Sequence, residues 1–191
     1  MKIKYIIEGT RTEKQQKDID IMNDKSFGNS NNSDEPKEEF DINTYEWSAP
    51  EDGIFLLFDG ERAVGMAAVH KVMTEYNGQK YCLGGFGGLA VLPEYRGKGY
   101  GRKLAEVALA KAYEIGVDVA CMCVDMESGI TDFYQKLGFK FLNRSAYFIN
   151  HGNSEATDDT VMIMGLNNKN LADEILETNH KFHYGKHKGH W

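Results

Sequence analysis

Residues 89–104 read Leu89-Ala90-Val91-Leu92-Pro93-Glu94-Tyr95-Arg96-Gly97-Lys98-Gly99-Tyr100-Gly101-Arg102-Lys103-Leu104. The apolar residues before Pro93 are typical of a strand, and residues 99–115 have the apolar spacing of a helix. The glycines between them allow backbone N–H groups to converge on an anion, and the N-terminus of the helix adds partial positive charge. The cationic side chains of this stretch are Arg96, Lys98, Arg102 and Lys103. We therefore expect a doubly anionic group to bind here.

Two familiar phosphate-binding loops do not fit this stretch. A P-loop needs Ser or Thr after Gly-Lys, but Gly99 follows Lys98, and a Rossmann fingerprint needs a third glycine where Arg102 stands. The remaining pattern, Arg-x-x-Gly-x-Gly after a strand that ends Val-x-Pro, resembles the pyrophosphate motif of the GNAT superfamily of N-acetyltransferases. Residues 132–139 contain Phe-Tyr-x-x-x-Gly-Phe, which is similar to the second signature of that family. The resemblance extends over residues 50–166.

The resemblance implies acetyl-CoA as the co-substrate and assigns roles to individual residues. The pyrophosphate would be held by Arg96, Gly97, Lys98, Gly99, Tyr100 and Gly101. The backbone of Leu89, Ala90 and Val91 would bind the pantetheine arm, and the Val91 amide would polarise the thioester carbonyl. Tyr134 would be the general acid that protonates the departing thiolate, and packing in the core is its alternative role. The general base stays open between His70, Asp125 and Glu127.

The rest of the chain predicts an antiparallel meander followed by a strand–helix–strand crossover, hence an α/β fold of the GNAT type. Expected strands cover residues 2–7, 53–58, 63–72, 80–91, 117–124, 139–149 and 160–166, and expected helices cover 12–24, 99–115 and 128–137. The central sheet is expected to be mixed and mostly antiparallel, with about six to seven strands flanked by helices. Residues 1–166 form the expected acetyltransferase domain, with a mobile loop at 26–41. Residues 167–191 form a tail that is expected to fold over the acceptor site.

Composition limits the classes of partner. The formal net charge of −7 argues against nucleic acid, and no apolar run approaches the ~20 residues that span a bilayer. We expect a cytoplasmic protein with three reduced cysteines and a small-molecule amine as the acceptor. The acidic balance fits a cationic acceptor. The oligomeric state stays open, with a homodimer as one alternative.

A closer resemblance is to the aminoglycoside 2′-N-acetyltransferases. Residues 41–47, the acidic turn at 156–161 and the terminal tryptophan are similar to features on the substrate side of those enzymes. The substrate-binding residues that this resemblance implies are Asp41, Glu46, Gly87, Gly88, Asp158 and Trp191. Gly87 and Gly189 stand where that family has carboxylates, so the acceptor amine is expected to differ. A protein N-acetyltransferase and a non-catalytic acetyl-CoA-binding module are the alternative functions.

Four histidines of the tail have helical spacing: His180, His183, His187 and His190. Gly185 and Gly189 argue against a helix there, and no cysteine or acidic residue lies among the histidines. An ordered tail without a metal is therefore the main expectation, and metal binding is kept as a second hypothesis.

Overall fold

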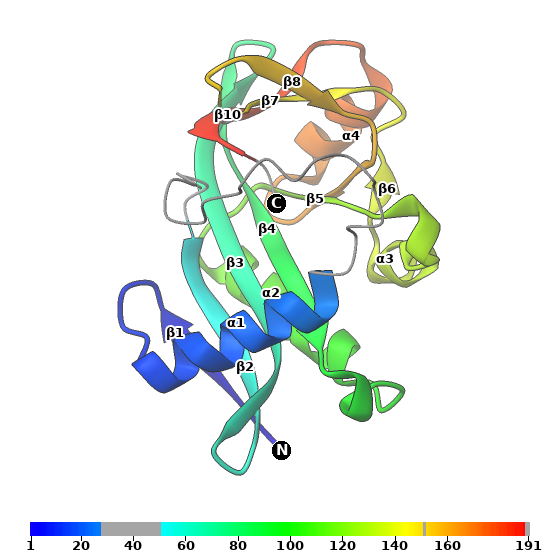
Figure 1. Cartoon of the computed structure of the whole chain (residues 1–191). Coiled ribbons are helices and arrows are strands. Elements are labelled where there is room, and N and C mark those ends of the chain that lie inside the picture. Colours follow the sequence, from blue (N-terminus) through cyan, green and yellow to red (C-terminus); the bar gives the residue numbers. More distant parts are fainter. Residues whose placement is uncertain (28–50, 151, 190–191) are drawn as a thin grey trace.

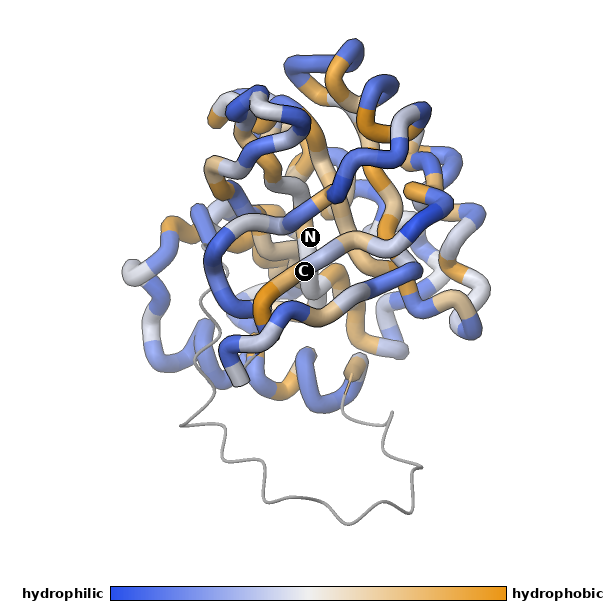
Figure 2. Tube along the Cα trace, turned by 90° about the horizontal axis from the view of Figure 1, so that it is seen from above, coloured by the Kyte–Doolittle hydropathy of each residue, from blue (hydrophilic) through white to orange (hydrophobic). Residues whose placement is uncertain are grey.

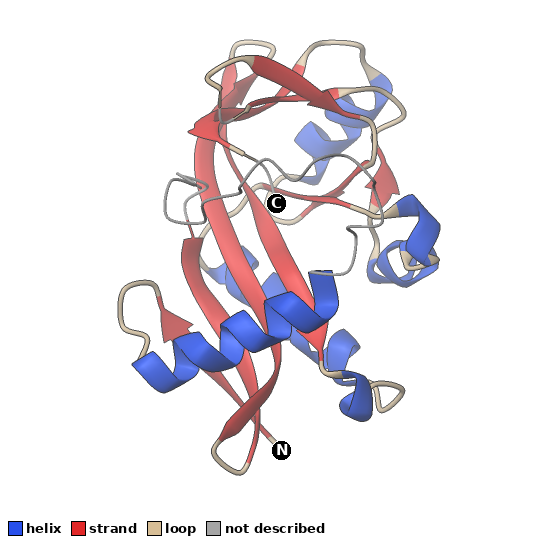
Figure 3. Cartoon of the chain, in the orientation of Figure 1, coloured by secondary structure: helices blue, strands red, loops and turns tan. Residues whose placement is uncertain are grey.

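The structure, a computed structural model, describes residues 1–27, 51–150 and 152–189. Its largest element is a seven-stranded sheet in the order β1-β2-β3-β4-β5-β9-β6 (Figure 1, Figure 3). The strands are β1 (Lys2–Ile7), β2 (Glu51–Asp59), β3 (Arg62–Tyr76), β4 (Gln79–Val91), β5 (Val119–Cys123), β9 (Val161–Gly165) and β6 (Lys140–Phe141). Within this sheet β4 and β5 pair in parallel, and the other neighbouring strands pair antiparallel. The expected mixed, mostly antiparallel sheet is confirmed.

Strands β1 to β4 form the predicted meander. Asn77 and Gly78, which connect β3 to β4, have φ values of 49° and 78°. Positive φ at both central positions matches the twist of an antiparallel hairpin, and Asn-Gly adopts it at little cost. The resulting hairpin places β4 next to β3 from Tyr76 to Gly65, so it carries β4 across the whole sheet to the glycine-rich segment.

Two long helices cover opposite faces of β2–β4 (Figure 1). Helix α1 (Glu13–Phe27) buries Ile19 and Met22, and helix α2 (Tyr100–Glu114) buries Leu104, Ala105, Ala108 and Ala112. The prediction starts the loop at residue 26, which is too early, because residues 26 and 27 still belong to α1. No Gly or Pro interrupts this stretch before Gly28. The rest of that loop lies outside the described residues.

The second half of the sheet is built around β5. Alternate residues of β5 face two cores: Ala120 and Met122 pack in the core that contains α1 and α2, whereas Val119 and Cys121 pack in the core that contains α4. The 3₁₀ helix η2 (Met126–Ser128) and helix α3 (Thr131–Leu137) follow. The expected single helix at 128–137 begins later than predicted, because Gly129 adopts a φ of 69° and separates η2 from α3.

A second sheet of three strands, in the order β10-β7-β8, was not expected from the sequence. Strand β7 (Ala146–Ile149) pairs antiparallel with β8 (Glu155–Asp158) and parallel with β10 (Phe182–Lys188). The expected single strand at 139–149 is therefore wrong. Between β6 and β7 the chain passes from one sheet to the other, and Asn143 has a φ of 26° in that connection. Helix α4 (Lys169–Glu177) precedes β10.

The hydropathy of the chain follows these layers. Hydrophobic residues gather on the central strands, and hydrophilic residues gather on the outer turns and on the outward side of the helices (Figure 2). Within the described ranges, no helix combines the length and the apolar character needed to cross a bilayer.

Candidate active site

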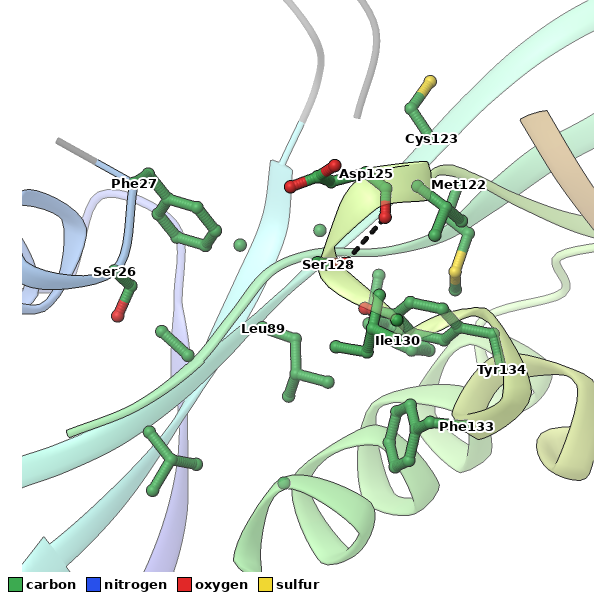
Figure 4. Close-up of a pocket in the computed structure, with 18 of the residues that line it drawn as sticks. Ser26, Phe27, Leu89, Met122, Cys123, Asp125, Ser128, Ile130, Phe133 and Tyr134 are labelled. Atoms are coloured by element: carbon green, nitrogen blue, oxygen red, sulfur yellow. Dashed lines mark hydrogen bonds between the residues drawn. The ribbon is translucent and has the colours of Figure 1, made fainter. Parts of the chain in front are cut away.

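The candidate site lies where β4 and β5 separate. The two strands pair only at Leu83–Val119 and Gly84–Ala120. Beyond these pairs β4 contains a bulge, because Ala68 of β3 faces Gly87 while Met66 faces Ala90. The bulge depends on Gly88, whose φ of 57° is a conformation that glycine adopts freely. A cavity of about 710 Å³ opens between the diverging strands (Figure 4).

The cavity is lined by residues from four parts of the chain. They are Ser26 and Phe27 of α1, residues 86–91 of β4, Arg96 and Gly101 of the glycine-rich segment, and residues 122–125, 128–130, 133 and 134 around β5 and α3. Most of these residues are apolar or glycine, so the cavity combines an apolar interior with few charged groups.

The glycine-rich segment presents an open backbone surface. Gly97 and Gly99 have φ values of 73° and 77°, and no atom lies within 4 Å of where a Cβ would stand on either residue. Helix α2 begins directly afterwards, with Gly99 at its N-cap and no side chain capping it. The first N–H groups of a helix have no partner within the helix and attract anions. This geometry fits a diphosphate group.

Arg96 ties this segment to the end of β4. Its Nε donates a hydrogen bond of 2.8 Å to the Val91 carbonyl oxygen, so the guanidinium is held at the edge of the cavity. Lys98 is exposed, and its Nζ lies 5.5 Å from the centre of the Tyr95 ring. Both cations therefore flank the open backbone of Gly97 and Gly99.

Tyr134 of α3 extends its ring into the cavity beside Ile130 (Figure 4). The ring packs against Phe86 and Phe133, at centroid distances of 6.1 Å and 5.0 Å, and the residue is only 8% exposed. Burial raises the pKa of the Tyr134 hydroxyl above its ordinary value. The neutral, proton-carrying form is therefore favoured at physiological pH, as a general acid requires.

The three candidate bases occupy different environments. Asp125 lines the cavity, Glu127 is exposed and does not line it, and His70 is buried on β3 away from the lining. The Asp125 Oδ1 atom accepts a hydrogen bond of 2.9 Å from the backbone N–H of Glu127. Of the three, Asp125 alone contributes to the cavity wall.

Comparison with known proteins agrees with this geometry. A family profile described as "Acetyltransferase (GNAT) family" matches residues 19–139, which is more than half of the chain. The chain belongs to this family. Its members use acetyl-CoA as the acetyl donor, and the segment that matches includes β2 to β4, the glycine-rich segment and α3.

Solved structures share the fold of this GNAT acetyltransferase. A GCN5-related N-acetyltransferase from Kribbella flavida aligns with a TM-score of 0.54 and 21% identity, over 77% of this chain but only 35% of that chain. Escherichia coli ElaA aligns with a TM-score of 0.59 and 15% identity, over 85% and 99% of the two chains. A chain of the NatC complex bound to a Gag peptide and CoA aligns with a TM-score of 0.51 and 21% identity, over 87% and 99%. No curated protein matches the sequence.

The cavity brings together several of the residues singled out from the sequence. Leu89, Ala90 and Val91 line it, as do Gly87 and Gly88, together with Arg96, Gly101 and Tyr134. Gly97, Lys98, Gly99 and Tyr100 lie beside it, in the segment that leads into α2. Asp41, Glu46 and Trp191 lie outside the described residues.

Asp158 lies apart from the cavity lining. At the end of β8, its Oδ1 accepts hydrogen bonds from the Thr160 N–H at 2.7 Å and the Thr160 hydroxyl at 2.6 Å. Its charge helps to raise the pKa of the Cys123 thiol, although burial is the larger cause. Asp158 therefore does not line the cavity itself but interacts with Cys123, which does.

Sequence reasoning missed part of the cavity lining. Residues 122–124 were not missed, because they belong to the apolar run that predicts β5, and the family resemblance implies a gap between this run and the strand of residues 89–91. Ser26 and Phe27 carry no such signal, because they reach the cavity only through the packing of α1 on the sheet. Among the described residues, no group of three or more His, Cys, Asp or Glu side chains is arranged to hold a metal.

Proposed function

We propose that this acetyltransferase transfers the acetyl group of acetyl-CoA directly to a primary amine of a small cationic acceptor. One observation carries the proposal: a single cavity has Arg96 and Gly101 of the glycine-rich segment in its lining together with Tyr134 of α3. A diphosphate held at the first two residues can therefore belong to the same ligand whose sulfur lies at the third.

The open backbone of Gly97 and Gly99 and the uncapped start of α2 fit the pyrophosphate of acetyl-CoA. Arg96 and Lys98 add positive charge there. The glycine bulge of β4 leaves the backbone of residues 89–91 along the cavity, where it fits the amide groups of the pantetheine arm. When bound, acetyl-CoA supplies the activated thioester.

Residues of the chain then direct the transfer. The Val91 N–H is assigned to polarise the thioester carbonyl, which makes its carbon a better target for the acceptor nitrogen. The new N–C bond forms as the C–S bond breaks, and Tyr134 gives its phenolic proton to the departing sulfur. The acceptor nitrogen, which attacks as the neutral amine, releases its extra proton to solvent water, and the Tyr134 phenolate recovers a proton from solvent. The products are an acetamide and the free thiol of CoA.

An assay of CoA thiol release against a panel of acceptors tests the proposal. The panel contains alkyl amines, diamines, aminoglycosides and peptides with free N-termini or lysines. We expect turnover with small cationic amines and little with peptides. The relative bound to a Gag peptide gives a reason to include peptides, since preference for them would assign the protein to the N-acetyltransferases of proteins instead. Binding of acetyl-CoA without turnover on any acceptor would indicate a non-catalytic module.

A further inference from the structure

The charged groups of the cavity are few and belong to different strands. Among the described lining residues, Arg96 and Asp125 have charged side chains. Arg96 follows β4 and belongs to the glycine-rich segment, whereas Asp125 follows β5. No ion pair joins them, since none of the ion pairs among the described residues includes either one. The cavity therefore has separate positive and negative sites.

Asp125 is fixed in place but keeps its charge accessible. Its Oδ1 accepts the Glu127 N–H, and its backbone carbonyl accepts a hydrogen bond of 2.6 Å from the Ser128 hydroxyl (Figure 4). These contacts hold the start of η2 and leave the carboxylate exposed. In Figure 4 the carboxylate points away from Tyr134, toward the side of the cavity where Phe27 of α1 lies.

This position suits a cation of the acceptor that does not react. An ammonium group beside a carboxylate is stabilised in its protonated form, and a protonated nitrogen cannot attack a thioester. The reacting nitrogen must also lie near the group that protonates the sulfur, and the Asp125 carboxylate points away from Tyr134. A second cationic group on the same acceptor does not react, so it can stay protonated and can lie away from Tyr134.

We propose that Asp125 binds a second ammonium group of the acceptor, so that the preferred substrates are diamines or larger polycations. The proposal rests on the proposed function. Asp125 is then the residue that selects the acceptor, and it selects amines that carry a second cationic group. The carboxylate forms a charge-assisted hydrogen bond with the distal ammonium, and the proximal amine is thereby directed toward the thioester.

The test compares α,ω-diamines with alkyl monoamines of matched chain length, using the wild-type chain and Asp125→Asn. Asparagine keeps an oxygen for the Glu127 N–H and removes the charge. The wild type should favour the diamines by about fivefold in kcat/KM, which is the scale of one ion pair that is partly exposed. Asp125→Asn should lower kcat/KM for the diamines more than for the monoamines, and so abolish this preference. Added salt should shrink the preference of the wild type, because it screens the pair.

Glu127→Gln is the matched control, since it removes another exposed carboxylate, two residues away, that does not line the cavity. It should keep the preference for diamines. Equal effects of the two variants, or an equal loss for both amine classes in Asp125→Asn, would overturn the role of Asp125.

Calorimetry of diamine and monoamine binding to the CoA-saturated protein gives the same comparison without turnover. Selective diamine binding that depends on Asp125, without acetyl transfer, would refute the proposed function and keep the cation site. Transfer to amines without any preference for diamines would keep the proposed function and refute the site.

Discussion

The Tyr184 hydroxyl lies 3.1 Å from the Cys123 sulfur. Tyr184 is fully buried on β10, and Cys123 ends β5 and lines the cavity. The contact therefore joins β10 to the wall of the candidate active site. It makes β10 a structural support of the cavity.

Removal of His190 and Trp191 should raise the KM of the acceptor about 10-fold or more, which corresponds to about 1.4 kcal/mol of lost binding free energy, because Trp191 is one of the predicted acceptor-binding residues. These residues lie outside the described part of the chain, and the prediction rests on their sequence and on Gly189, whose N–H is bonded to the Ile149 carbonyl. Steady-state kinetics would measure the effect. Acetyl-CoA affinity should stay the same, and unaltered acceptor kinetics would contradict the prediction.

The change Gly99→Asp should abolish acetyl-CoA binding. It puts a side chain into the open space beside the start of α2, in a left-handed conformation, and it adds a negative charge where the pyrophosphate is expected. Calorimetry would measure the loss. Gly116→Asp is the control for backbone strain, because Gly116 has a φ of 84° just beyond the other end of α2 and also faces open space. If Gly99→Asp folds and binds acetyl-CoA with unchanged affinity, the pyrophosphate binds at a place other than the glycine-rich segment.

The change Tyr134→Phe should lower kcat about 10²-fold while the stability barely changes. No hydrogen bond within the described residues involves the Tyr134 hydroxyl, so phenylalanine keeps the packing against Phe86 and Phe133 and leaves no buried group unpaired. Thiol release and thermal unfolding would measure the two effects. A rate within a factor of about two of the wild type would show that Tyr134 serves packing alone.

Stability should fall as the pH rises above about 8.5, where thiols of an unfolded chain begin to lose protons. Burial raises the pKa of Cys121, Cys123, Tyr81 and Tyr184 in the folded protein. The unfolded chain therefore releases protons that the folded protein keeps, and the free energy of unfolding decreases. Urea denaturation at successive pH values would measure this slope.

Tyr184→Phe gives a check on that assignment. It removes one of these groups, so above pH ~10 its stability should fall less steeply than that of the wild type, by up to about 1.4 kcal/mol per pH unit. Parallel slopes for the two proteins would show that Tyr184 titrates alike in the folded and unfolded states.

The sequence predicts the first half of the fold better than the second. The meander depends on local signals such as Asn77-Gly78, and α2 on a regular apolar face, so both follow from neighbouring residues. The passage from β6 to β7 depends on which sheet each short strand joins. That choice is made by distant partners, β9 for one strand and β8 and β10 for the other. The pattern of residues 139–149 alone therefore does not predict which sheet each strand joins.

The site shows the same division. The glycine-rich segment could be placed because its chemistry is contiguous in the chain. Phe27 could not, since it reaches the cavity only through the packing of α1, and Asp125 could be named as a candidate but not distinguished from Glu127. Asp125 and Glu127 stand two residues apart at the start of a 3₁₀ turn, so their side chains differ in direction, and the sequence does not tell which one faces the cavity.

The separation of β4 from β5 leaves two edge strands inside the molecule. An edge strand exposes unpaired N–H and C=O groups and is usually a risk, because it can recruit another protein chain and aggregate. Here the two edges face one another across the cavity between residues 86–91 and 122–124, joined at their base by the pairs at Leu83 and Gly84. A slender molecule with amide groups along its length can enter from one side and pair with both edges, so the gap in the sheet is itself a filter for the donor.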